Sequence, residues 1–125
     1  MVRSVVSALV ALALIVGGGI AERIFIENSF SSLEEAFTEL GEDIEREVCT
    51  REKAEKALEK WLDEKEKLHA FIPHSEIKEL DLWISETVGL VEKKDYKEAF
   101  VKNQVTLNLL KEIPKTFSIR FANLF

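Results

Sequence analysis

The spacing of apolar residues along the chain is helical almost throughout. After an uncharged N-terminal run, apolar side chains recur in steps of three and four, which places them on one face of an α-helix. No alternation typical of a β-strand lasts beyond a few residues, and only two prolines and two glycines follow residue 21. The pattern therefore predicts an all-α fold, whose first apolar seam comprises Ile26, Phe30, Leu33, Phe37, Leu40 and Ile44.

Signals for helix starts and stops divide the rest of the chain. Thr50 can cap a second helix, and Pro73 both breaks that helix and suits the first position of a third. Asp95 can cap a fourth helix, which Pro114 is expected to stop. A faint internal repeat, in which Leu33, Leu40 and Ile44 recur 44 positions later as Ile77, Ile84 and Val88, predicts two antiparallel helical hairpins packed like a four-helix bundle. Six side chains are predicted to be largely buried in it: Leu40, Ile44, Trp61, Ile84, Leu107 and Leu110.

The N-terminal apolar run indicates a membrane segment. Residues 5–21 (VVSALVALALIVGGGIA) carry no charge. As a helix they would span roughly 25 Å, slightly short of a hydrocarbon core of about 30 Å. Arg3 precedes the run, whereas Glu22 and Arg23 balance each other after it, which favours a cytoplasmic N-terminus. The sequence thus predicts an N-terminal transmembrane helix in residues 1–27, single-pass in the cell membrane, and an extracytoplasmic helical domain in residues 28–125.

Two questions about this region stay open from the sequence. Gly19 and Ala21 also supply small residues at the two positions that a signal peptidase reads, and cleavage there would release a secreted soluble domain beginning at Glu22. Apolar character resumes at Ile24, which favours a retained anchor. Ser31 and Ser32 are each followed three residues later by a glutamate, as in a capping box. The first domain helix therefore either begins near Ser31 or runs unbroken from the membrane.

Charge and cysteine content narrow the function classes. The net charge is −6, with acidic and basic residues interleaved along the whole chain. No basic patch is present to neutralise phosphates, which argues against nucleic-acid binding. The lone cysteine, Cys49, cannot form an intramolecular disulfide, and we interpret it as a small buried apolar side chain. No small-molecule substrate and no cofactor is indicated.

The stretch FIPHSEIKELDLWI (Phe71 to Ile84), together with His69 just before it, holds the one group of residues that could carry chemistry. His69, His74 and Glu76 would be the ligands of a small metal-dependent enzyme or sensor. Helical zinc sites, however, place histidines three or four apart, with a third ligand on the same face. His69 and His74 are five apart with Pro73 between them, and His74 and Glu76 would point to different sides of a helix. We interpret the stretch as a helix start, and assign no catalytic, cofactor or metal site.

Several motifs together resemble a bacterial family of small membrane-anchored proteins, domain of unknown function 4363. They are the apolar N-terminus, EKALEKW with Trp61, IPHSEIKELDLWI (Ile72 to Ile84), VEKKDYKEAF (Val91 to Phe100) and LLKEIP (Leu109 to Pro114). The resemblance implies an all-helical extracytoplasmic domain in a Gram-positive-type bacterium. It implies no reaction and no catalytic residues.

The function expected from these observations is that of a non-enzymatic, membrane-tethered helical protein. It would serve as an accessory or protein-interaction module of the bacterial cell envelope, with a membrane or envelope protein as its partner. The alternatives are the metal-dependent enzyme or sensor built on His69, His74 and Glu76, and the secreted domain left after signal cleavage.

Overall fold

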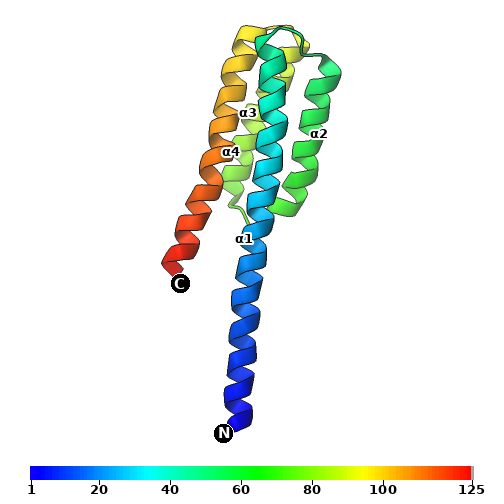
Figure 1. Cartoon of the computed structure of the whole chain (residues 1–125). Coiled ribbons are helices and arrows are strands. Elements are labelled where there is room, and N and C mark those ends of the chain that lie inside the picture. The colour runs from blue at the N-terminus through cyan, green and yellow to red at the C-terminus, as the bar shows by residue number, and fades with distance from the viewer. Residues whose placement is uncertain (125) are drawn as a thin grey trace.

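The computed structural model consists of four α-helices: α1 (Val2–Glu45), α2 (Arg51–Leu68), α3 (His74–Glu92) and α4 (Tyr96–Leu124) (Figure 1). It describes the backbone of residues 1–124 and the side chains of residues 1–116. No strand occurs within residues 1–124. The all-α prediction is confirmed.

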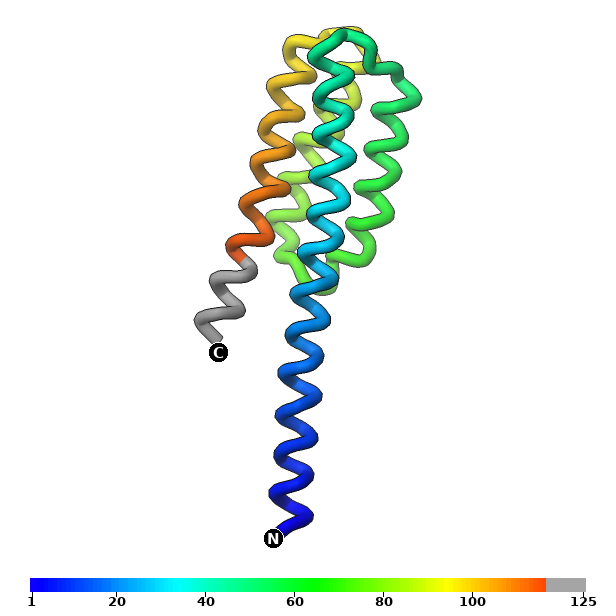
Figure 2. Tube along the Cα trace, viewed as in Figure 1, coloured from blue at the N-terminus to red at the C-terminus, as the bar shows by residue number. Residues whose placement is uncertain are grey.

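The helices form a ring in which each packs against the next and α4 closes on α1. Successive helices run in opposite directions, so α1–α2 and α3–α4 are the two antiparallel hairpins that the sequence predicts (Figure 1). The connections 46–50 and 93–95 lie at one end of the bundle, which we call the distal end. The connection 69–73 lies at the opposite end, from which the N-terminal half of α1 projects, and we call this the anchor-side end (Figure 2).

Helix α1 is continuous from the apolar N-terminal run into the bundle (Figure 2). The first domain helix therefore does not begin near Ser31 but runs unbroken from the apolar N-terminal run. The apolar seam explains this, because it begins at Ile26, which is already buried, and continues without a phase change to Ile44. Residues of the same helix face are buried both before and after Ser31 and Ser32. Packing therefore keeps the helix continuous there, and the capping signals are not used.

Each helix contributes one apolar face to a common core. All six side chains predicted to be buried are buried, and Trp61, Ile84 and Leu110 are completely inaccessible. Burying side chains of this size contributes roughly 1.5–3 kcal/mol each relative to exposure. The seam that the sequence pattern defines is therefore the one that holds the bundle together.

The predicted caps of α2 and α4 are present. Thr50 Oγ1 accepts a hydrogen bond from the amide of Lys53 at 3.2 Å, and Asp95 Oδ1 accepts one from Glu98 at 3.4 Å. The sequence predicts Pro73 at the first helical position of α3, but Pro73 occupies the N-cap, one residue before the helix. Its ψ of 143° is extended, and α3 begins at His74. The two side-chain caps therefore fix the starts of α2 and α4 where the sequence indicates, whereas α3 starts one residue later than predicted.

The two hairpins are closed at the distal end by the same kind of turn. Glu47 and Lys94 follow the ends of α1 and α3 with φ values of 58° and 60°, in the left-handed region. The amide of Val48 donates to the carbonyl of Asp43, and the amide of Asp95 donates to the carbonyl of Leu90, both at 2.9 Å. This is the Schellman pattern, which satisfies carbonyls that the helix end leaves free.

The prediction that Pro114 stops the fourth helix is wrong, because α4 continues through it to Leu124. A proline removes one amide donor, but the apolar face of α4 persists on its N-terminal side, where Leu110 and Ile113 are buried. Pro114 itself lies beside Phe30 in a groove between α4 and α1. The hydroxyl of Thr116 donates to the carbonyl of Glu112 at 3.2 Å, as in a helix that goes on. The expected packing of the C-terminal side chains from residue 117 onward falls outside the described side chains.

Candidate functional site

The two histidines come together at the anchor-side end. His69 follows the last residue of α2 and His74 is the first residue of α3, and the turn between them brings their rings to 5.8 Å between centroids, 28° from parallel. The amides of Phe71 and Ile72 both donate to the carbonyl of Leu68 at 2.9 Å, which fixes the turn. Both histidine side chains are exposed.

A third metal ligand does not join this pair. Among the described side chains, residues 1–116, no group of three or more histidine, cysteine, aspartate or glutamate residues is close enough to hold a metal ion. Glu76 lies two residues beyond His74 in the first turn of α3 and contributes its negative charge to the positive end of that helix. The arrangement that the metal-dependent alternative requires, His69, His74 and Glu76 around one ion, is therefore not formed.

The same turn is attached to α1 by an aromatic contact. The rings of Phe25 and Phe71 have centroids 5.6 Å apart and are inclined by 59°, a geometry typical of attractive aromatic pairs. Ile72, next to Phe71, is buried in the core, whereas Phe71 keeps 37% of its surface exposed. The connection 69–73 therefore lies at the level of Phe25, close to where the apolar run of α1 ends.

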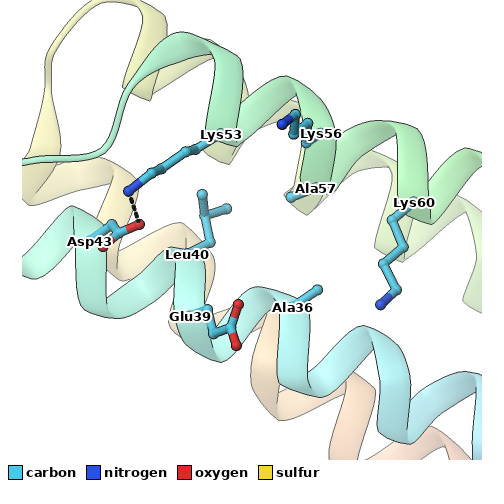
Figure 3. Close-up of a pocket in the computed structure, with 8 residues that line it drawn as sticks. All are labelled: Ala36, Glu39, Leu40, Asp43, Lys53, Lys56, Ala57 and Lys60. Atoms are coloured by element: carbon cyan, nitrogen blue, oxygen red, sulfur yellow. Dashed lines mark hydrogen bonds and ion pairs between the residues drawn. The ribbon is translucent and has the colours of Figure 1, made fainter.

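A shallow groove of about 360 Å³ runs along the outside of the α1–α2 pair (Figure 3). Its floor contains Ala36 of α1 and Ala57 of α2, whose small side chains leave space between the two backbones. Sequence analysis did not find this groove. Its one signal is the pair of alanines on facing helices, which becomes informative only when the register of α1 and α2 is known.

Opposite charges line the two sides of this groove. Glu39 and Asp43 come from α1, and Lys53, Lys56 and Lys60 come from α2 (Figure 3). Asp43 Oδ2 and Lys53 Nζ form an ion pair at 3.0 Å at one end. No hydroxyl or thiol nucleophile is among the residues lining this groove. The groove can hold charged or polar groups by contact with its carboxylates and ammonium groups.

Cys49 has the surroundings of a structural thiol, as the sequence interpretation expects. Its side chain is buried just before α2, and its thiol is 3.7 Å from the carbonyl of Thr50. Burial raises the pKa of the Cys49 thiol, the carboxylate of Asp43 raises it further, and Lys53 lowers it in part. A thiol held protonated in this way is a poor nucleophile at neutral pH.

One polar contact in the core was not expected from the sequence. Asn103 of α4 is completely buried, and its Nδ2 donates to the carbonyl of Phe37 in α1 at 2.9 Å. Its Oδ1 has no hydrogen-bond partner within the described part of the chain. The contact joins two helices that are distant in sequence, so it specifies how α4 docks on α1.

Comparison with known proteins supports the family resemblance of the sequence motifs. Neither curated proteins nor solved structures gave a match. A family described as domain of unknown function (DUF4363) matches residues 22–124, from the end of the apolar run to the end of α4. The resemblance seen in the sequence motifs is therefore confirmed, and the chain belongs to the DUF4363 family of domains of unknown function.

Proposed function

We propose that this protein is a membrane-tethered helical module of the bacterial cell envelope, which acts without catalysis through contacts with another membrane or envelope protein. The observation that carries the proposal is the continuity of α1. One helix holds an apolar span of mean hydropathy 2.3, none of which is buried, and then the seam from Ile26 to Ile44 that forms the core.

An exposed apolar span of this kind is unfavourable in water. Leu9, Leu12 and Ile15 each expose more than half of their surface, and no residue of this span is buried among the side chains that the structure describes. A lipid environment would cover these side chains at about 25 cal/mol for each Å² removed from water. The domain would then stand on the outer face of the cell membrane, with the N-terminus in the cytoplasm.

The absence of catalysis is supported by the described side chains. The histidine pair lacks a third ligand among the described side chains, Cys49 is held protonated by burial, and the α1–α2 groove is shallow and lined by charges of both signs. Surfaces of this type recognise other molecules by contact. A tether limits such contacts to molecules at or near the membrane, which is why the partner is expected there.

The tether is tested by fractionation of cells that express the full chain. Replacing Leu12 and Ile15 by arginine should release the protein from washed membranes, since each arginine at the centre of a span costs about 2.5–3.5 kcal/mol. Leu82→Arg is the matched control, because Leu82 is equally exposed but lies on the bundle. This variant should stay with the membrane. If the double variant also stays, the apolar run is not what holds the protein.

The partner is tested by affinity capture in mild detergent. The wild-type chain should enrich a membrane or envelope protein, and the Leu12→Arg, Ile15→Arg chain should enrich it much less. Capture of background proteins alone by both chains would contradict the interaction role and leave the tether standing.

A further inference from the structure

We propose that the connection between α2 and α3, residues 69–73, is a second membrane contact. In this contact the side chain of Phe71 lies in the headgroup region of the bilayer that holds α1. This inference rests on the proposed tether and adds a site that the tether alone does not require. It assigns a lipid surface as the partner of the anchor-side end of the bundle.

The first support is the position of the turn along the axis of α1, relative to the apolar span. Ile24 is half exposed, so exposed apolar side chains of α1 occur from Val2 to Ile24, with Arg3 near one end of this stretch and the charged pair Glu22 and Arg23 near the other. Over this length a helix spans roughly 33 Å, enough for a hydrocarbon core of about 30 Å. Phe25 then lies at the boundary, and its contact with Phe71 places the turn at that boundary too.

The second support is the direction of α1. Because α1 has no break between the apolar run and the bundle, the bundle cannot swing away from the bilayer on a flexible linker. The first buried residue, Ile26, follows Ile24 by only two positions, or about 3 Å along the helix. The anchor-side end is therefore held within the headgroup layer, which is about 5–7 Å deep on each side of the core.

The third support is the contrast between the two ends of the bundle. Residues 68–75, LHAFIPHS, contain no carboxylate, and His69, Ala70 and Phe71 are exposed. The distal connections read REVCT and KKD and are rich in charge. Phenylalanine is among the apolar side chains that interfacial segments bury at the boundary of headgroups and acyl chains, and a turn without carboxylates does not repel anionic lipids.

The turn is also built to hold its shape. Ile72 is buried below it, the two amides of Phe71 and Ile72 share the carbonyl of Leu68, and Phe71 leans on Phe25. A preorganised turn loses little conformational entropy when it enters the headgroups. Phe71 therefore occupies its exposed position before the turn meets the lipid, and the contact requires no rearrangement of the turn.

Spin labels on the full chain in vesicles of phosphatidylcholine and phosphatidylglycerol test this contact. In a Cys49→Ala background, single cysteines are placed at Ala70 in the turn, at Val48 in the distal end and at Ile15 in the anchor, all of which are exposed. The ratio of collisions with oxygen to collisions with a water-soluble nickel chelate reports depth. It should be highest at position 15, severalfold lower at 70, and severalfold lower again at 48.

A ratio at position 70 equal to that at 48, with a high ratio at 15, would overturn the second contact and leave the tether intact. Low ratios at all three positions would overturn the tether as well. The role of Phe71 is tested with Phe71→Ser, which should lower the ratio at position 70 part of the way towards that at 48, because α1 still keeps the turn near the bilayer, and with Leu82→Ser, which should leave it unchanged. If Phe71→Ser leaves the ratio unchanged while helicity is retained, the assignment to Phe71 is wrong.

Discussion

The side-chain amide of Asn103 on α4 donates to the main-chain carbonyl of Phe37 on α1, with 2.9 Å between nitrogen and oxygen. Gly41, one turn further along α1, makes this approach possible. A Cβ built on Gly41 would lie 2.8 Å from Nδ2 of Asn103, closer than two such atoms tolerate. The closing contact of the ring of helices thus depends on one glycine and one asparagine.

Replacing Gly41 by alanine should destabilise the bundle by about 1–3 kcal/mol, because the core would be overpacked at Asn103. Gly89→Ala is the matched control, since a Cβ there meets nothing within 4 Å and α3 continues on both sides. That control should stabilise the protein by up to about 1 kcal/mol through helix propensity. Urea unfolding of the full chain in mild detergent, followed by tryptophan fluorescence, measures both. Equal effects of the two substitutions would contradict the close contact.

The indole of Trp61 depends on Asp81 in the neighbouring helix. Trp61 is fully buried, its Nε1 donates to Oδ1 of Asp81 at 2.6 Å, and the other oxygen of Asp81 accepts from Lys65 at 2.6 Å. Asp81→Ala should cost about 1–3 kcal/mol, because the buried indole N–H loses its acceptor. Asp81→Asn keeps an acceptor oxygen and loses only a partly exposed ion pair, so its cost should stay below about 1 kcal/mol. If both variants unfold at the same urea concentration, the indole bond does not contribute.

Truncation of the seam should be costly where the structure buries it. Leu40→Ala and Ile84→Ala should each lower the free energy of unfolding by about 2–5 kcal/mol, since each leaves a cavity. Leu82 lies two residues from Ile84 but keeps 53% of its surface exposed, so Leu82→Ala should change the free energy by no more than about 0.5 kcal/mol. The same urea titration gives all three values. A large effect at Leu82 would indicate that this face is covered by another molecule.

The turn after α3 should be improved by glycine. Lys94 has a φ of 60°, a conformation that costs an L-residue roughly 1–2 kcal/mol and costs glycine almost nothing. Lys94→Gly should therefore raise the free energy of unfolding by about 0.5–1 kcal/mol. Lys93, with a φ of −83°, is the control, and Lys93→Gly should lower stability or leave it unchanged. A loss of stability in Lys94→Gly would mean that the lysine side chain contributes more than its backbone costs.

The core could be predicted from the sequence because its information is local. Steps of three and four from Ile26 to Ile44 identify the buried face of α1 without knowledge of its partners. Thr50 and Asp95 act within the first turns of their own helices, so their caps are also readable from the sequence. Pro114 shows the limit of local rules, because α4 continues through it although the proline removes one backbone hydrogen bond.

The parts that could not be predicted depend on pairing between distant segments. Asn103 and Phe37 meet only when α4 lies on α1, and Ala36 and Ala57 form a groove only in the observed register. The stacking of His69 on His74 likewise follows from the shape of the turn, not from their spacing. Whether α1 is broken near Ser31 could not be decided either, because a capping box and a continuing seam are both favourable there.

The central claim is that α1 stays intact, from its N-terminal apolar run into the bundle, in the mature protein. N-terminal sequencing of the mature protein, isolated from whichever cell fraction contains it, tests it most directly. The account predicts that the first residue lies ahead of Val5, so that the apolar span is retained and the bundle remains tethered. A mature protein that begins at Glu22 and is recovered outside the membrane would contradict the claim, and the proposed lipid contact of Phe71 would fall with it.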